Sequence, residues 1–178
     1  LMTKYEFGGA NIKGVYFDEE NRRHILNLRS IYGEAAGSMA DAGKPDQAKQ
    51  LIDKVEAGIN TTNLPYAMAS RYNGHNQTAL IYLEACFKAG KKELAEKVAA
   101  EIRKDLEQQA RYYNYIRDSK PDFWGYYERS EAPINERLLV VLSDIEARYK
   151  SAAGSKPVNE LNTPSIQTPA KPDTNKQK

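Results

Sequence analysis

Residues 42–48 read AGKPDQA and residues 89–95 read AGKKELA, so one short pattern occurs twice in this chain. Apolar residues recur at helical spacing before each glycine and resume at the same spacing beyond it. Gly43 and Gly90 tolerate the left-handed conformation that ends a helix, and the small Ala48 and Ala95 allow two helix axes to approach closely. Each copy of the pattern therefore predicts a pair of antiparallel helices.

The two glycines lie 47 residues apart, which exceeds the roughly 34 residues of a tetratricopeptide repeat. The segment between Gly58 and Asn76 accounts for the excess, and within it we expect a short helical turn or a packed excursion over residues 66–71. A further helix is expected from about Lys92 to beyond Tyr113, and another is expected to begin at Ala132 and Pro133. The sequence thus predicts an all-α fold of about five main helices, arranged as degenerate tetratricopeptide-like helical hairpin repeats.

The chain divides into three parts by composition. Residues 1–17 mix glycines with aromatic side chains, which is typical of an irregular arm that packs against the first helix pair. Asp18 and the acidic residues after it are suited to a helix N-terminus, so we place the helical repeat domain at residues 18–150. Residues 151–178 are rich in Pro, Ser, Thr, Asn, Gln and Lys, and this composition predicts a disordered tail.

Composition also narrows the function. The chain has 178 residues, 40% of them hydrophobic, and its 26 basic and 24 acidic residues nearly cancel, so nothing indicates a nucleic-acid partner. No apolar run reaches the roughly 18 residues that span a bilayer. The single cysteine, Cys86, lies on the apolar side of its helix, where a buried, unreactive thiol is expected. No phosphate, dinucleotide or nucleophile motif occurs, and we expect neither a cofactor nor a metal.

The two histidines lie on different expected elements, without metal-ligand spacing. His24 follows Glu20 by one helical turn, which favours a surface ion pair. His75 lies beside Arg71, Asn73 and Asn76, and these side chains have two interpretations. They form a candidate binding site for an acidic or hydroxylated ligand, or they cap a helix and brace the loop; the second interpretation is favoured.

A cluster of aromatic side chains provides the main candidate binding surface. It comprises Tyr112, Tyr113, Tyr115, Phe123, Trp124, Tyr126 and Tyr127, with Arg111, Arg117 and Arg129 nearby. Aromatic rings with arginines make good anchors for a peptide or a sugar. The alternative is that most of these rings pack the fourth helix against the fifth, and this alternative is favoured for most of them. Trp124, Tyr126, Tyr127 and Arg129 are the candidate binding residues, and Trp124 and Tyr127 are those expected to be exposed.

Two acidic residues adjoin this cluster. Glu128 and Glu131 are the candidates for a single general-acid carboxylate, as in helical enzymes that cleave peptidoglycan. Because both precede Pro133, they are also well placed to cap the fifth helix, and capping is favoured. We therefore expect no catalytic residue in this chain and no enzyme activity.

One long part of the chain resembles a known family. The resemblance covers Lys4 to Tyr113 and is carried by Tyr5, Phe7, Gly8, Gly9, Gly14, Val15, Tyr16, Phe17, Asp18, Glu19, Arg22, Arg23, Leu28, Arg29, Asn63, Leu64, Pro65, Tyr66, Ala89 and Gly90. These residues resemble the C-terminal soluble region of a bacterial family of multi-pass membrane proteins of uncertain function, common in Bacteroidetes. The membrane part of that family is similar to lipid-sugar-dependent glycosyltransferases related to protein O-mannosyltransferases. The resemblance implies an accessory, membrane-tethered domain on the periplasmic side.

The function that we expect is therefore a noncatalytic protein-interaction or scaffolding domain of a larger membrane protein. Its partner would be another protein or another part of the same membrane protein, and membrane contact would come only through a region preceding this chain. The alternatives are a carbohydrate-binding module, which would show coplanar exposed rings, and a helical lytic enzyme, which would hold Glu128 or Glu131 in a cleft.

Overall fold

The computed structural model describes residues 2–3 and 5–152, and all regular secondary structure within them is helical. Five α-helices occur with two short 3-10 turns: α1 (Glu19–Asp41), α2 (Pro45–Gly58), η1 (Arg71–Asn73), α3 (Gly74–Lys88), α4 (Lys92–Ser119), η2 (Pro121–Phe123) and α5 (Tyr126–Ala152). The all-α prediction is confirmed. Of the tail expected at 151–178, the first two residues belong to α5 and residues 153–178 lie outside the described residues.

The repeated pattern forms the same turn twice. Gly43 and Gly90 both have φ of 72°. After α1, the Gly43 N–H donates to the Ala40 carbonyl at 3.0 Å and the Lys44 N–H donates to the Met39 carbonyl at 2.9 Å. The turn after α3 repeats both bonds at the equivalent positions, so each helix ends in a Schellman motif. Each turn therefore reverses the chain into a second helix.

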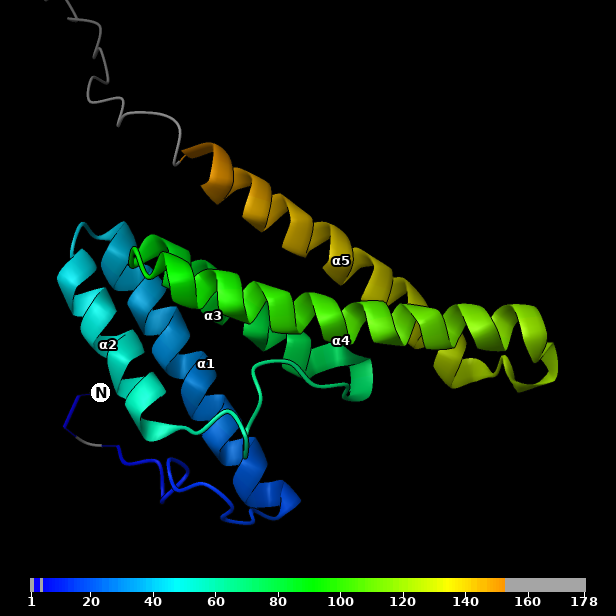
Figure 1. The fold of residues 1–178 in the computed structure, drawn as a ribbon, viewed down its shortest axis with the longest axis horizontal. Helices are drawn as coiled ribbons and strands as arrows, with labels where there is room; N and C mark the ends of the chain where they lie inside the picture. The colour runs from blue at the N-terminus through cyan, green and yellow to red at the C-terminus, as the bar shows by residue number, and fades with distance from the viewer. Residues whose placement is uncertain (1, 4, 153–178) are drawn as a thin grey trace, which may run out of the picture.

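The helices form two hairpins with a fifth helix added at one side. Helix α1 packs against both α2 and α3, α3 packs against α4, and α4 packs against α5. Figure 1 shows α2 and α1 at one side of the molecule and α4 with α5 at the other. Small residues allow the close approaches: Ala48 and Ala95 are fully buried, and a Cβ added at Gly33 would lie 3.2 Å from Tyr82 Cδ2.

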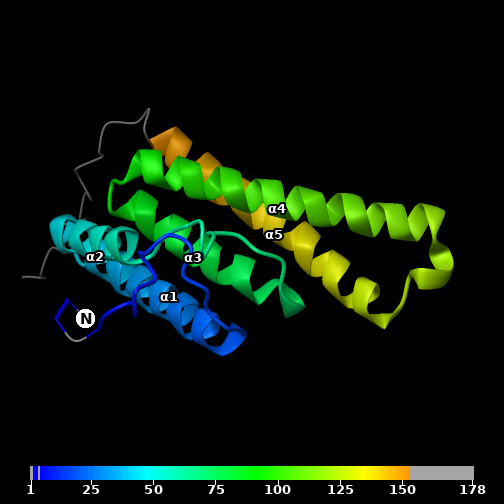
Figure 2. The same cartoon turned by 60° about the horizontal axis from the view of Figure 1, so that its bottom comes forward.

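Helices α4 and α5 also reach well beyond the end of α3. Figures 1 and 2 both show this projecting end, which is closed by the connection through η2. The last buried residue of α4 is Tyr113, although the helix continues to Ser119. The projecting end of the α4–α5 hairpin therefore lies outside the main core.

The N-terminal arm packs as expected over the first hairpin. The Phe7 ring is buried against Tyr32, with the ring centroids 5.5 Å apart. Asn63 then secures the arm, because its Oδ1 accepts the Gly14 N–H at 3.1 Å and its Nδ2 donates to the Ile12 carbonyl at 2.7 Å. Tyr16, in contrast, is 88% exposed. The packing prediction therefore holds for Phe7 but not for every aromatic ring of the arm.

The segment between α2 and η1 is a packed excursion. Leu64 and Tyr66 are buried, and the guanidinium of Arg29 donates to the carbonyls of Leu64 and Pro65 at 2.7 and 2.8 Å. Below them, Glu56 accepts the hydroxyl of Tyr66 at 2.5 Å. Burial lowers the pKa of Arg29, and the nearby Glu56 opposes this effect. The buried guanidinium of Arg29 therefore holds this segment against α1.

The start expected for the fifth helix was wrong. The sequence places it at residues 132–133, but α5 begins at Tyr126 and contains Pro133 within it. Pro133 is exposed, and it has no N–H to donate to the Arg129 carbonyl one turn earlier, yet α5 continues through it. Glu128 Oε2 accepts the Gly125 N–H at 3.1 Å, so the capping interaction occurs one to two turns earlier than the proline suggests.

Candidate functional site

The projecting end of the α4–α5 hairpin carries exposed aromatic side chains. They are Tyr112 (48% exposed), Tyr115 (54%), Phe123 (70%), Tyr126 (85%) and Tyr127 (51%), and we call them the aromatic end. Tyr113 is the ring of this cluster that is buried, at 6%. The expectation that most of these rings form core is therefore wrong, because α4 extends past α3 and no third helix of the described residues covers it there.

Trp124 lies half-buried beside the aromatic end. It lines a cavity of about 280 Å³ together with Tyr113, Asn114, Arg117, Arg129 and Glu136; we call this the Trp124 pocket. Arg129 Nε donates to the Trp124 carbonyl at 3.1 Å, and Arg117 Nε lies 2.9 Å from Asp118 Oδ1. Tyr127 is exposed as expected, whereas Trp124 is only partly so. The candidate residues Trp124 and Arg129 are thus brought together in one pocket.

The two candidate acids have separate structural roles. Glu128 accepts the Gly125 N–H at the start of α5, which confirms the cap interpretation. Glu131 is 1% exposed, and its Oε1 accepts the N–H of Tyr72 at 2.7 Å. Glu131 therefore does not cap its own helix as expected, because it binds a backbone N–H that is 59 positions away in sequence. This bond fixes η1 against α5.

The turn at η1 has an unusual backbone. Tyr72 and Asn73 have φ of 54° and 51°, so two consecutive residues other than glycine are left-handed. Asn73 is fully buried, and its side chain contacts Asn76, Gln109 and Asn135 within hydrogen-bonding distance. The surrounding side chains thus stabilise a conformation that costs about 1–2 kcal/mol per residue.

These amides belong to a buried polar network that joins three helices. Asn76 Nδ2 donates to Asp105 Oδ2 at 2.7 Å, Gln109 Nε2 donates to the same oxygen at 2.7 Å, and Asn135 Nδ2 donates to the Leu106 carbonyl at 3.0 Å. Asn73 and Asn76 therefore brace the loop, as the favoured interpretation holds. Sequence reasoning missed Asp105, Gln109 and Asn135, because no local pattern shows which residues of distant helices will meet.

The other two residues of the loop, Arg71 and His75, have a different environment. Both line a groove against the first turns of α1, and the buried amides are not among its lining residues. Burial lowers the pKa of His75, and the positive charge of Arg29 lowers it further. The candidate group Arg71, Asn73 and His75 is thus divided: the asparagine is part of the structure, and the cation and imidazole face a cavity.

The remaining single residues behave as predicted. His24 Nε2 lies 3.1 Å from Glu20 Oε1 on the exposed side of α1. Cys86 is fully buried, and burial raises the pKa of its thiol, which disfavours the reactive thiolate. Within residues 2–3 and 5–152, no three His, Cys, Asp or Glu side chains gather in a way that could hold a metal ion. Among the helices described, none combines the length and apolar character needed to cross a membrane.

No family model, curated protein or solved structure matches this chain. The resemblance to a membrane-protein family therefore stays a prediction from the sequence. The surfaces described above are the observations on which a function has to be argued.

Proposed function

We propose that this chain is a noncatalytic protein-interaction domain that contacts its partner through the aromatic end of the α4–α5 hairpin. The observation that carries this proposal is the exposure of five aromatic side chains in one short region, from 48% for Tyr112 to 85% for Tyr126. Such rings gain a large contact area on binding and lose little conformational freedom.

The shape of the molecule supports the same surface. The hairpin projects beyond the main core (Figure 2), so a partner can approach the aromatic end without meeting the first hairpin. Arg117 and Arg129 line the adjacent Trp124 pocket. Arg117 bonds Asp118, its neighbour in sequence, and Arg129 bonds the Trp124 carbonyl. Aromatic residues together with arginine are the side chains that most often dominate protein interfaces.

Site-specific photocrosslinking tests this proposal. A photoreactive phenylalanine derivative would replace Tyr126 in the native host, and in a matched control it would replace Tyr5, which is 47% exposed on the N-terminal arm. We expect a defined crosslinked protein at position 126 that is absent at position 5. Excess purified domain should compete for this product, while the variant F123S/Y126S should not compete.

Two results would contradict the proposal. One is the same crosslinked products at positions 126 and 5, which would mean nonspecific contact. The other is equal competition by the parent domain and by F123S/Y126S, with unchanged helical circular dichroism for both. A control variant, Y5S/I12S, removes two apolar side chains of 47% and 58% exposure from the arm, and it should compete as well as the parent.

The Trp124 pocket favours a second candidate, a carbohydrate-binding module. A half-buried tryptophan beside Arg, Asn and Glu side chains can stack on a sugar face and bind its hydroxyls. Against it, Tyr112 and Tyr113 meet at 65° instead of lying coplanar. Because Trp124 is the single tryptophan, its fluorescence gives the test: a saturable change with a mannose oligosaccharide, abolished in R129Q, would favour this function over protein binding.

We also propose that the domain belongs to a larger, membrane-tethered protein and lies on the periplasmic side. The support is the sequence resemblance to a family whose membrane portion, which is not part of this chain, is similar to glycosyltransferases. An antibody raised against the domain would test this in the native host. We expect a membrane-fraction band larger than the 20.1 kDa of this chain, which protease degrades in spheroplasts without lysis. A soluble band, or protection from protease, would contradict the proposal.

A further inference from the structure

A second surface lies where α1 and α3 begin. A groove of about 640 Å³ separates the start of α1 from the segment 68–78; we call it the basic groove. Its size lies within the range of about 300–1,000 Å³ that is usual for ligand sites. Its walls come from two segments far apart in the sequence, residues 16–27 and 68–78, so the groove exists only in the folded chain.

The charged side chains of the basic groove are mostly cationic. Arg22, Arg23 and Arg71 line it, against the single carboxylate of Glu19. Arg23 is paired with Glu20 at 2.7 Å. Within the described residues, Arg22 and Arg71 have no carboxylate partner: Arg22 Nη2 bonds the Met68 sulfur at 3.3 Å, and Arg71 stacks on the Tyr72 ring at 5.0 Å. These two guanidinium groups therefore line the groove without forming an ion pair in the described part of the chain.

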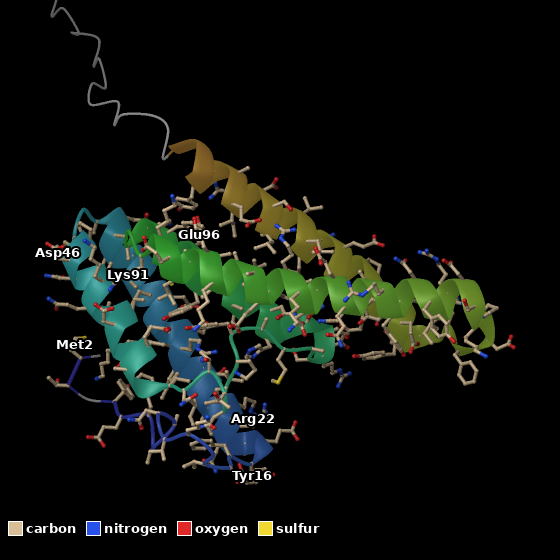
Figure 3. The ribbon with its side chains drawn as sticks, in the orientation of Figure 1. Met2, Tyr16, Arg22, Asp46, Lys91 and Glu96 are labelled. Carbon is tan, nitrogen blue, oxygen red and sulfur yellow. The ribbon has the colours of Figure 1, made fainter. Side chains whose placement is uncertain are left out.

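The remaining lining suits a peptide. Phe17, Leu26 and Met68 supply apolar contacts, while Ser70, Thr78 and Asn27 supply polar ones. His75 also lines the groove, although its Nε2 is buried, close to the backbone of Pro65 and Tyr66. Figure 3 shows Tyr16 and Arg22 together at the end of the molecule where α1 begins, and Tyr16 is almost fully exposed at the groove's edge.

We propose that the basic groove binds an acidic segment of a partner protein, with Arg22 and Arg71 each binding a carboxylate of that segment. Charge complementarity selects the occupant, because an anionic group satisfies the two guanidinium groups and a neutral or basic peptide does not. The apolar lining favours a peptide over a free carboxylate ion. The basic groove is a different surface from the aromatic end, so this proposal does not depend on the proposed function.

Nuclear magnetic resonance gives the test, because it detects weak binding at each residue. The ¹⁵N-labelled protein would be titrated with acetylated tetraglutamate amide, with acetylated tetraglutamine amide as the neutral control. We expect saturable shifts of the Ser70 and His75 amides and of the Arg22 and Arg71 Nε–H signals, with tetraglutamate only. The variant R22Q/R71Q should weaken this binding about tenfold or more.

A matched variant separates the groove from overall charge. Lys104 and Arg137 are exposed on α4 and α5 and lie outside the groove, so K104Q/R137Q makes the same change in net charge. It should bind tetraglutamate as the parent does. Equal losses in the two double variants, no saturation up to about 5 mM, equal binding of tetraglutamine, or tighter binding of inorganic phosphate would each overturn the proposal. Thermal melting of the single variants R22Q and R71Q controls for folding.

Discussion

Asn73 combines two tasks in one side chain. Its left-handed backbone turns the chain into α3, and its amide group contacts α3, α4 and α5 at once. Asparagine suits such a position because it tolerates the left-handed region better than other residues with a side chain. The residue is therefore a structural part of the loop that sequence reasoning also considered as a binding group.

Substitutions of Asn73 should separate these two tasks. We expect N73A to lower the free energy of unfolding by about 2–3 kcal/mol, since it adds backbone strain and leaves buried partners unpaired. N73G keeps the turn and loses only the amide, so its loss should be smaller. Urea denaturation measures both. The control N114A, at an exposed position of α4, should stay within about 0.5 kcal/mol; equal effects of N73A and N114A would contradict the assigned role.

His75 should make stability depend on pH. Its pKa in the folded protein is lowered from the ordinary 6.5, by burial first and by Arg29 next, with Asp105 opposing. The unfolded chain therefore takes up the proton at higher pH than the folded chain does, and the free energy of unfolding falls as pH decreases below about 6.5. Urea midpoints measured from about pH 7.5 to about pH 5 should show this fall.

The variant H75Q isolates the effect, because glutamine does not titrate. We expect a smaller fall of the urea midpoint with decreasing pH in H75Q than in the parent protein. The control H24Q changes the exposed histidine that pairs with Glu20. The urea midpoint of H24Q should still fall below about pH 6.5, because this variant keeps His75. The same pH profile in H75Q and in the parent would contradict this prediction, because it would show that the pKa of His75 is the same in the folded and in the unfolded protein.

At the scale of elements, the turns after α1 and α3 were predictable and the start of α5 was not. The repeated glycines act through local backbone geometry, because the bonds of each turn join residues at most five positions apart, such as Lys44 and Met39. The start of α5 depends on Glu128 reaching back to Gly125 and on the exposed position of Pro133. Proline is common in the first turn of a helix. Here the helix is already capped at Gly125, so Pro133 lies inside the helix instead of at its start.

The two glycine turns should respond alike to substitution. A Cβ has open space at Gly43 and lies 3.8 Å from Lys49 Cε at Gly90, so only the positive φ opposes alanine there. We expect G43A and G90A each to lower the free energy of unfolding by about 1 kcal/mol, and G43N and G90N to recover part of it. Thermal denaturation measures this, and a gain in stability for either alanine variant would mean that the turn is not left-handed in solution.

The whole molecule divides into a well-buried part and a projecting end. Buried residues of α4 end at Tyr113, and those of α5 begin at Glu131. Since local opening is easiest where few side chains are buried, amides of residues 114–130 should exchange with deuterium faster than those of α3. Mass spectrometry of peptides would measure the rates. Equal protection of the two regions would mean that the aromatic end is covered in solution, for example by a second copy.

At the scale of the whole molecule, the sequence predicted some residues of both surfaces but not how these residues are arranged. The aromatic cluster was visible in the sequence, but its exposure depends on how far α4 extends beyond α3. Arg71 and His75 were also visible, whereas Arg22 was not, because its place in the groove follows from the packing of α1 against a segment 46 residues away. Contacts of that separation have no local signal in a single sequence.

The two tyrosines that bond to the carboxylate of Glu56 can report on the opening of the core through their absorbance. This carboxylate accepts the hydroxyls of Tyr66 at 2.5 Å and Tyr82 at 2.6 Å, and burial, with Glu56 adding to it, raises the pKa of both phenols. After a jump to a pH above about 10, where tyrosine in an unfolded chain ionises, these two rings become tyrosinate only as the core opens. The slow part of the near-ultraviolet absorbance change therefore times the opening of the core between α2, α3 and the segment that holds Tyr66, without any attached dye. The variant Y66F should reduce its amplitude.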